Sequence, residues 1–364
     1  TEEWKETKLG KIAEITKGSG ISKGQLSEQG SLCILYGELY TKYKSEIINE
    51  VYSRTELDSS SLVKSKANDV IIPCSGETAI DISTARCVPF NNILLGGDLN
   101  IIRLKNNDGG FFAYQLNGTR KKDIARVAQG VSVVHLYGEN LKHIRVYHPA
   151  IEEQKKITRL LSLIDKRIAT QNKIIEDLKK LKSAISERLF NAIKGDVVVL
   201  EDIGDVVKGK QINGEFLSES GKYYVMNGGI EPSGFYNDYN VEANTISISE
   251  GGNSCGYVQF NACPFWSGGH CYTIQNTTDN VKTEYLYQFL KSKESEIMKL
   301  RIGSGLPNIQ KKDLAKFKIT IPNISEQKVI SAFLSSFERK ADVEMNFVNL
   351  LLEEKQYLLR QMFI

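Results

Sequence analysis

The chain has 364 residues, of which 41% are hydrophobic and 25% are charged. This length favours two or three domains over a single core, and the composition is typical of a globular protein. No apolar stretch approaches the 18 or more residues of a membrane span. The N-terminus carries acidic residues where an export signal would carry basic ones. We therefore expect a cytoplasmic protein with several domains and no membrane association.

The net charge of +3 is small, and the main basic excess lies in residues 151–194, which carry eleven basic and six acidic residues. A protein that held DNA mainly by neutralising phosphates would show a stronger overall excess. Any DNA binding by this chain should therefore be shared with a more basic partner.

The six cysteines form no C-x-x-C pair of the kind that zinc sites need, so we interpret them as free buried thiols. Cys255, Cys263 and Cys271 lie eight residues apart, and His270 is adjacent to the last of them. This spacing is typical of alternate strands in a β-rich region rather than of a metal site. We expect no bound metal.

The first globular part covers residues 1–148, where short β-rich runs alternate with clusters of glycine, asparagine and serine. Strands are predicted at 69–72 and 99–103, and a short helix is predicted at 111–127. The pattern indicates an α+β domain with many loops at one face.

A long helix is predicted over residues 149–194. No proline or glycine interrupts residues 150–194, and Glu152 and Glu153 lie in the first turn, where the helix dipole favours acidic side chains. The apolar residues form a heptad seam with alternating spacings of four and three, at Ile157, Leu161, Ile164, Ile168, Ile175, Leu178, Ile185 and Leu189. Polar residues interrupt this seam at Gln171 and Lys182.

The second globular part, residues 195–321, has the same character, with a strand predicted at 245–248 and a short helix at 283–299. A second long helix is predicted over residues 322–364. Its seam follows the same spacing, at Ile330, Leu334, Phe337, Ala341, Val348, Leu351, Leu358 and Met362. Glu344 and Lys355 occupy the positions of Gln171 and Lys182 in the first helix.

The chain is therefore an internal duplication of one globular part followed by one helix. Residues 149–157 (PAIEEQKKI) and 322–330 (PNISEQKVI) match at a constant offset of 173. The same offset aligns Gly130 with Gly303, His135 with Asn308, Leu136 with Ile309, and Leu141 with Leu314. At smaller offsets Gly96 and Gly97 align with Gly268 and Gly269, and Gly18 aligns with Gly209.

A helix of about 40 residues is roughly 60 Å long, and its apolar seam needs a partner in water. The simplest arrangement is an intramolecular, antiparallel coiled coil that separates two similar β-rich α+β domains. Two alternatives are that each helix packs on its own globular part, or that the helices pair between chains. In the coiled coil, Gln171, Lys182, Glu344 and Lys355 would set the register or contact a partner.

Enzyme signatures are absent or incomplete, and we predict no catalytic residue. None of the seven prolines adjoins another, so the Pro-Pro-aromatic motif of amino-methyltransferases is missing. Residues 204–211 imitate a phosphate-binding loop, but Gln211 stands where a hydroxyl must hold magnesium. Residues 153–155 and 326–328 resemble half of a nuclease metal site. Because both open long helices, Gln154 and Gln327 are better explained as helix-terminal polar residues or partner contacts.

Polar loops with glycine are the better functional candidates, because glycine lets the backbone approach phosphates while polar side chains read base edges. In the first half the candidate DNA-binding residues are Lys17, Ser19, Lys23, Ser75, Glu77, Thr78, Gln129, Ser132 and His135. In the second half they are Lys208, Lys210, Gln211, Asn213, Asn227, Asn253, His270, Arg301, Ser304 and Asn308. Only a fraction of them should touch DNA, since loops carry function where the scaffold directs them.

These features together resemble the specificity subunits of Type I restriction-modification systems, and the resemblance covers almost the whole chain. It rests on residues 4–12 (WKETKLGKI) with Gly18 and on a weaker echo at 200–203 (LEDI) with Gly209. The two helix starts described above complete it. The second half departs from the pattern because it lacks a tryptophan at its start.

The resemblance implies that each globular half is a target-recognition domain for one half of a split, asymmetric site in double-stranded DNA, with the helices setting the gap. It also implies that two methyltransferase subunits dock on the helices and bring S-adenosylmethionine. Translocating nuclease subunits that use ATP and magnesium can join them, and the chain itself binds no cofactor. Two other classes remain open: a DNA methyltransferase or nuclease with a divergent site, and a coiled-coil adaptor without DNA binding.

Overall fold

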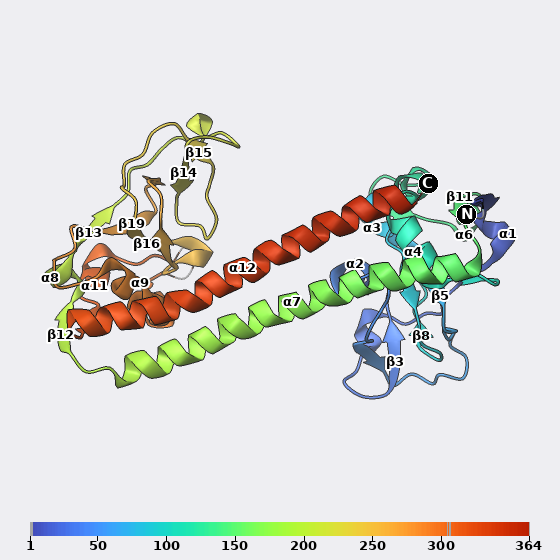
Figure 1. Ribbon diagram of the computed structural model, residues 1–364, viewed down its shortest axis with the longest axis horizontal. Helices are drawn as coiled ribbons and strands as arrows, with labels where there is room; N and C mark the ends of the chain where they lie inside the picture. Colours follow the sequence, from blue (N-terminus) through green and yellow to red (C-terminus); the bar gives the residue numbers. More distant parts are fainter. Residues whose placement is uncertain (1–2, 304, 306, 364) are drawn as a thin grey trace. The chain divides into compact units, whose positions relative to one another are not determined.

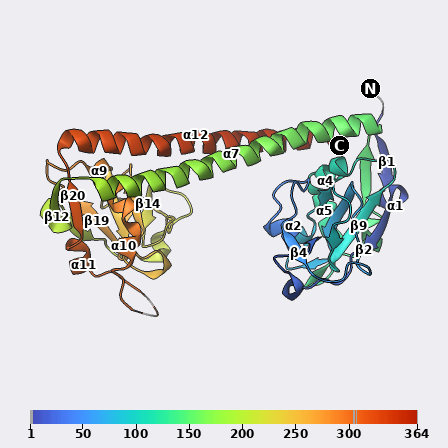
Figure 2. The same ribbon diagram turned by 90° about the horizontal axis from the view of Figure 1, so that it is seen from below.

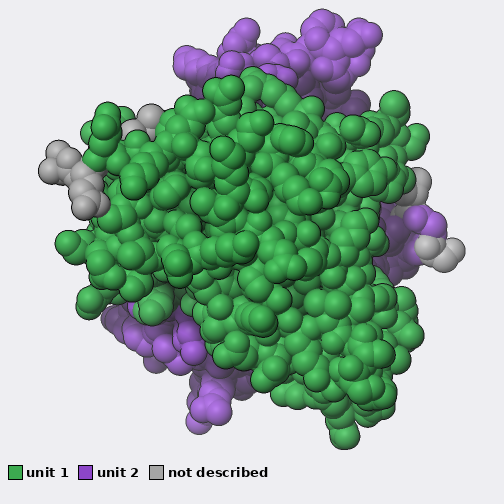
Figure 3. All heavy atoms as spheres, turned by 90° about the vertical axis from the view of Figure 1, so that its right-hand side faces the viewer, with its two compact units in different colours: residues 1–172, 346–364 green, residues 173–345 purple. Residues whose placement is uncertain are grey.

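The computed structural model describes residues 3–303, 305 and 307–363. It divides into two compact units, which Figure 3 colours separately. Unit 1 comprises residues 1–172 and 346–364, and unit 2 comprises residues 173–345. Each unit therefore contains one globular part together with a piece of each long helix. The borders expected at 148, 194 and 321 separate globular parts from helices, whereas the compact units divide the helices themselves.

The two long helices are α7 (Ile151–Ala192) and α12 (Ile324–Met362). In unit 1 the strands of the described residues are β1 (Lys5–Lys8), β2 (Ala13–Lys17), β3 (Ser31–Ile34), β4 (Ser53–Thr55), β5 (Asp69–Pro73), β6 (Ser75–Gly76), β7 (Arg86–Val88), β8 (Leu94–Leu95), β9 (Leu99–Leu104), β10 (Val134–His135) and β11 (Arg145–His148). The shorter helices there are α1 (Leu9–Ile12), α2 (Glu38–Thr41), α3 (Ala79–Ile82), α4 (Gly109–Asn117), α5 (Lys121–Arg126) and α6 (Gly138–Leu141), with the 3-10 turn η1 (Lys23–Gln25).

In unit 2 the strands of the described residues are β12 (Asp196–Val199), β13 (Asp205–Lys208), β14 (Tyr223–Met226), β15 (Phe235–Tyr236), β16 (Thr245–Ser249), β17 (Val258–Asn261), β18 (Trp266–Ser267), β19 (Cys271–Gln275) and β20 (Lys318–Ile321). The shorter helices are α8 (Leu200–Ile203), α9 (Thr283–Ser292), α10 (Glu294–Met298) and α11 (Lys311–Ala315), with the 3-10 turns η2 (Gly214–Phe216) and η3 (Gly252–Ser254).

The strands β5, β9 and β16 confirm the three strands expected from the sequence. Each of the two short helices expected at 111–127 and 283–299 is instead a pair of helices, α4 with α5 and α9 with α10. The backbone leaves the helical region at Gly118, where φ is −88° and ψ is −107°. It does so again at Lys293, where φ is −100° and ψ is 13°. Both breaks fall in short polar runs, at residues 117–123 and 291–296, where no apolar residue marks the helical face.

Three sheets of unit 1 repeat in unit 2, while the pair β6-β10 of unit 1 corresponds only to the isolated bridge between Gly251 and Asn308. The order β2-β9-β5-β7 in unit 1 corresponds to β13-β19-β16-β17 in unit 2, and β4-β3-β8 corresponds to β15-β14-β18. In each three-stranded sheet the last pair is parallel. The antiparallel pair β1-β11 corresponds to β12-β20. The expected duplication is therefore confirmed at the level of topology.

In each unit, the start of one long helix packs beside the end of the other over the globular core (Figures 1 and 2). In unit 1, Leu161 of α7 and Phe363 after α12 belong to the same core, where Phe363 contacts Phe111 with ring centroids 5.1 Å apart. In unit 2, Phe190 of α7 and Leu334 of α12 share the other core. The expected antiparallel pairing within one chain is confirmed, and packing on the globular parts accompanies it.

Two lysines of the seams bond to acidic residues of the opposite helix. In unit 1, Lys355 Nζ lies 2.6 Å from Asp165 Oδ1, and the hydroxyl of Tyr114 donates to Asp165 Oδ2 at 2.7 Å. In unit 2, Lys182 Nζ lies 2.6 Å from Glu338 Oε1, to which the Tyr287 hydroxyl donates at 3.3 Å. All three positions of the second cluster correspond to those of the first at the offset of 173. These charged groups fix one antiparallel register in both units.

The other two polar seam positions are also buried. Gln171 is 3% exposed and Glu344 is 8% exposed, and Glu344 forms an ion pair with Lys340 of its own helix. Their burial along the seam is consistent with a role in helix pairing.

Gln154 and Gln327, which we expected at the helix pair or at a partner, instead tie each long helix to its own globular part. The Gln154 side chain accepts a hydrogen bond from the Asp108 backbone N–H and donates to the Pro149 carbonyl, both at 2.9 Å. Gln327 accepts from the Lys282 N–H at 2.8 Å and donates to the Pro322 carbonyl at 2.9 Å. Both side chains are at least 99% buried. These bonds fit the helix-terminal role that the sequence suggested for both glutamines as an alternative to a partner contact.

The described residues contain no helix long and apolar enough to cross a membrane. Within the same residues, no three histidine, cysteine, aspartate or glutamate side chains are grouped so that they could hold a metal ion. The six cysteines are free, and all except the exposed Cys263 are buried, as expected. Burial raises the pKa of the Cys74 and Cys271 thiols to about 11, which makes them poor nucleophiles.

Candidate nucleic-acid interface

In unit 1, strand pairing gathers candidate residues from two loops. Strand β6 pairs with β10, so that Ser75 lies opposite His135. The backbones of Gln129 and His135 exchange hydrogen bonds at 2.9 and 2.7 Å, which close a short hairpin. Ser132 lies exposed within that hairpin. Ser75, Gln129, Ser132 and His135 therefore form one continuous edge, as the loops of a reading surface require.

Glycine makes this edge possible at one point. Gly130 has a φ of +119°, and a Cβ there would lie 2.1 Å from the Val133 carbonyl oxygen. The equivalent Gly303 of unit 2 also has a positive φ, of +98°. Only glycine adopts this backbone at low cost, so the tight return of the hairpin is a shared feature of both units.

Other candidates of unit 1 have roles within the loops. The Ser19 hydroxyl accepts a hydrogen bond from the Val63 N–H at 2.8 Å, and Thr78 caps α3 by accepting from the Asp81 N–H at 3.1 Å. Glu77 and Lys17 are exposed beside them. We conclude that Ser19 and Thr78 stabilise the loops, while the exposed side chains of Lys17 and Glu77 can face a ligand.

Lys23 borders a hollow of about 1070 Å³ that sequence reasoning missed. Tyr36, Tyr40 and Asp98 line it as well. The Asp98 carbonyl accepts a hydrogen bond from the Cys74 N–H at 2.7 Å, so the hollow adjoins the loop of Ser75. Tyr36 lies in the turn after β3 and Tyr40 lies in α2, and no spacing in the sequence sets them apart from core aromatics.

In unit 2, Lys208 and His270 converge on a residue that we did not select, Glu250, and Asn227 bonds to the His270 backbone. Lys208 Nζ lies 2.6 Å from Glu250 Oε1, and His270 Nδ1 lies 3.6 Å from Glu250 Oε2. Asn227 Oδ1 accepts a hydrogen bond from the His270 backbone N–H at 3.2 Å. The buried hydroxyl of Tyr272 donates to Glu250 Oε1 at 3.0 Å. These residues form one polar cluster at the end of β16.

The hairpin that carries Arg301 and Asn308 returns beside the same cluster. Asn308 forms isolated bridges with Ile302 and Gly251. The Ile309 N–H donates to the Glu250 carbonyl at 2.8 Å. Arg301, Asn308 and Asn253 are exposed there. Ser304 lies outside the described residues.

Three further candidates lie before β14. The exposed Gln211 packs so closely over Gly269 that a Cβ at that glycine would lie 2.4 Å from Gln211 Oε1. Lys210 is exposed, and its backbone N–H donates to the Ser267 carbonyl at 2.8 Å. Asn213 is exposed as well, and its side chain caps η2 by accepting from the Glu215 N–H. Gln211 and Lys210 therefore adjoin the cluster, whereas Asn213 stabilises its loop.

The two edges have the same backbone frame and different side chains. In unit 1 the Cys74 N–H donates to the Asp98 carbonyl, and the Leu136 N–H donates to the Cys74 carbonyl. In unit 2 the corresponding bonds join Glu250 to the His270 carbonyl and Ile309 to the Glu250 carbonyl. Cys74 therefore corresponds to Glu250, and Asp98 to His270. The frame presents chemically different groups from equivalent positions.

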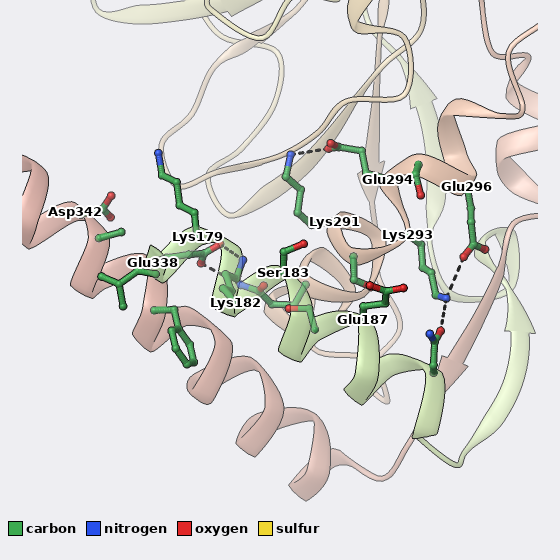
Figure 4. Close-up of a pocket in the computed structure, with 18 residues that line it drawn as sticks. Lys179, Lys182, Ser183, Glu187, Lys291, Lys293, Glu294, Glu296, Glu338 and Asp342 are labelled. Atoms are coloured by element: carbon green, nitrogen blue, oxygen red, sulfur yellow. Dashed lines mark hydrogen bonds and ion pairs between the residues drawn. The ribbon is translucent and has the colours of Figure 1, made fainter. Parts of the chain in front are cut away.

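A separate hollow of about 680 Å³ lies in unit 2 between α7, α12 and the α9–α10 corner (Figure 4). Apart from Ser183, its labelled side chains are charged, but several of them neutralise one another. Lys293 Nζ lies 3.0 Å from Glu296 and 2.8 Å from Asn191, and Lys182 points to Glu338. The hollow therefore holds structural ion pairs, and the predicted reading loops do not line it.

Comparisons with known proteins agree with this arrangement. Residues 1–180 and 194–351 match the family model described as the Type I restriction modification DNA specificity domain. A putative type I specificity subunit of Mycoplasma pneumoniae is 34% identical over 44% of this chain and 42% of its own length. The Type I restriction enzyme MjaVIII specificity subunit of Methanocaldococcus jannaschii is 22% identical over 94% of this chain and 88% of its own length. The match thus spans less than half of the mycoplasma relative.

Solved structures share the fold. The crystal structure of a Type I restriction-modification S subunit from M. genitalium has a TM-score of 0.70 and 19% identity, and the superposition covers 100% of this chain and 97% of that chain. A chain from a structural study of assembly in the type I R-M system has a TM-score of 0.61 and 15% identity over 98% of this chain and 97% of that one. Duplicated domains joined through two long helices are therefore common to all three chains.

Proposed function

Because the chain belongs to the Type I restriction modification DNA specificity family, we propose that it is the DNA-sequence-recognition subunit of a cytoplasmic Type I restriction-modification complex. Each unit reads one half of a bipartite, asymmetric site in double-stranded DNA. Methylation and cleavage belong to partner subunits, and this chain supplies recognition.

The observation that carries this proposal is the pair of equivalent edges with different side chains. A duplicated frame repeats the way a domain approaches DNA, while the side chains on its edge determine which base edges it favours. His135 and Asn308 occupy equivalent positions at the two edges, as do Asp98 and His270. Two such readers recognise two different half-sites.

The helices support the proposed docking of two methyltransferase subunits, one on each unit. In unit 1, Leu160, Leu163 and Leu350 are exposed on α7 and α12. In unit 2, Leu181, Phe333 and Val343 are exposed on the same helices. Rows of exposed apolar side chains are a feature of protein interfaces. The partners would bring S-adenosylmethionine, and restriction subunits would bring ATP and magnesium.

Methylated adenines mapped in DNA from cells that carry this chain and its methyltransferase partner test the proposal. We expect two short specified blocks separated by an unread gap of fixed length. The substitution His135→Ala should change only one block, and the matched Asn308→Ala should change only the other. A single continuous block, or methyl transfer by the purified chain alone, would contradict the proposal.

A further inference from the structure

We propose that unit 2 recognises a G·C base pair through Lys208 and His270, and that the buried Glu250 is the residue that positions both. This inference rests on the proposed function, because it names the base pair that one reading edge takes. Glu250 is a positioning residue here, while Lys208 and His270 are the groups that touch the base edges.

The first step is the direction in which the cluster presents its charges. The Glu250 side chain is only 9% exposed, whereas those of Lys208 and His270 are 52% and 64% exposed. Lys208 Nζ lies 2.6 Å from Glu250 Oε1, and His270 Nδ1 lies 3.6 Å from Oε2. The acceptor is therefore held inside the unit, and the lysine and the imidazole ring face outward.

The second step is how firmly Glu250 is held. The Tyr272 hydroxyl donates to Glu250 Oε1 at 3.0 Å and also lies 3.1 Å from the Ile309 carbonyl oxygen. Burial raises the pKa of Tyr272, and its hydrogen bond to Glu250 raises that pKa further, so the hydroxyl remains a donor. The Glu250 backbone is fixed as well, by bonds to His270 and Ile309. Glu250 is a rigid anchor for both exposed side chains.

The third step matches the exposed groups to a base pair. A lysine ammonium has three donors, so Lys208 retains donors after bonding to Glu250. Guanine presents the acceptors N7 and O6 in the major groove, and its cytosine presents an amino donor. The neutral imidazole of His270 also carries one acceptor nitrogen, which can take the amino donor of cytosine. Two donors of the Lys208 ammonium match the adjacent N7 and O6 acceptors of guanine, whereas adenine presents N7 beside its own amino donor, so the lysine favours a G·C pair.

The fourth step is the contrast with unit 1. There the residue equivalent to Glu250 is Cys74, whose thiol is buried and whose pKa burial raises to about 11. An uncharged thiol cannot anchor a lysine, and Asp98 stands where His270 stands in unit 2. The equivalent lysine of unit 1, Lys17, is therefore a matched control. It occupies the same position in the fold but has Cys74 where Lys208 has Glu250.

The test uses the assembled complex of the full chain with its methyltransferase partner. Binding to duplexes in which each base pair of the wild-type motif is replaced in turn measures the preference at every position. For Glu250→Gln and for Lys208→Met, we expect the preference for one G·C pair in one half-site to fall about 10- to 100-fold. We expect Lys17→Met to leave that preference intact and His270→Ala to weaken it.

Three outcomes overturn the inference. The half-site altered by Asn308→Ala could contain no G·C pair that depends on Lys208, or Lys17→Met could reduce the same preference. Glu250→Gln could also weaken binding to all duplexes by one factor and leave the preferences unchanged, which is the result of a purely structural role. Because Lys208 and His270 are exposed, their variants decide the question even where Glu250→Gln fails to fold. A wild-type complex that recognises no bipartite motif would instead overturn the proposed function.

Discussion

The two units differ most where they face outward and least where they hold the helices. Both use the same sheets, the same glutamine at the helix start and the same lysine, acid and tyrosine cluster. Their reading edges share backbone bonds, but place Cys74 in one unit where Glu250 stands in the other. The duplicated units have therefore kept the residues that hold the long helices in place, while the residues that determine the chemistry of the reading edges have diverged.

One buried difference breaks this rule. In unit 1, Lys355 Nζ lies 2.6 Å from Asp165 and also 2.6 Å from Glu46, and its side chain is 9% exposed. In unit 2, Lys182 pairs with Glu338, which is 33% exposed. The same lysine thus neutralises two buried acids in one unit and one partly exposed acid in the other. Equivalent positions should therefore contribute unequally to stability.

The largest expected effect comes from Lys355→Met. The substitution leaves two carboxylates buried without their cation, and breaking a buried ion pair in this way costs about 3–5 kcal/mol. The matched Lys182→Met should cost about 1 kcal/mol or less, since solvent screens the remaining acid. Hydrogen exchange, resolved by peptide, measures each unit separately where a global unfolding curve would merge them.

We expect lost protection in the peptides of unit 1 for Lys355→Met, and a much smaller loss in unit 2 for Lys182→Met. Equal losses in the two variants would show that Glu46 adds nothing to the contrast between the units.

The second prediction concerns a feature that the units share. Gln154→Leu and Gln327→Leu each leave a backbone N–H and a helix-start carbonyl without their partner, at a cost of about 1–3 kcal/mol. Because the bonds are equivalent, the two variants should lose similar stability, each in its own unit. The exposed neighbour Glu153→Gln is the control and should change stability by less than about 0.5 kcal/mol. A loss confined to one glutamine would contradict the equivalence of the two helix starts.

The sequence predicts the parts of the fold that repeat. The offset of 173 connects the two long helices, their polar seam positions and the two hairpin glycines, Gly130 and Gly303. Heptad spacing survives in the sequence because a long apolar seam constrains many residues in the same way. For this reason the antiparallel pair and the duplicated α+β domains follow from pattern alone.

The reading edge could not be predicted at the same depth. Ser19, Thr78 and Asn213 are residue types that read bases, but they bond to backbone N–H groups: Thr78 and Asn213 within their own loops, and Ser19 to the distant Val63. Glu250 lies in the candidate loop 250–254 but was not itself selected, and its partners Lys208 and His270 lie 42 residues before it and 20 after it in the chain. Which side chains meet at a loop edge depends on strand pairing between distant segments. The register of that pairing cannot be inferred from the local sequence.

The smallest expected effect is a change in how the stability of unit 1 depends on pH. It comes from Glu46, and no such change is expected in unit 2. Burial raises the pKa of Glu46 above its ordinary value of 4.5, and Asp165 raises it further, while Lys355 acts in the opposite direction. A carboxyl with a raised pKa in the folded state contributes stability that is complete below pH 4.5 and is lost as the pH rises through the folded pKa.

Glu46→Gln keeps the shape of the protonated group and does not titrate. The stability of the wild type relative to this variant should therefore fall as the pH rises above 4.5. Exchange in the peptides of unit 1 measures the difference, and those of unit 2 provide the internal control. If the stability difference between the wild type and Glu46→Gln does not change with pH, Lys355 fully offsets the burial of Glu46. Glu46 would then not destabilise unit 1.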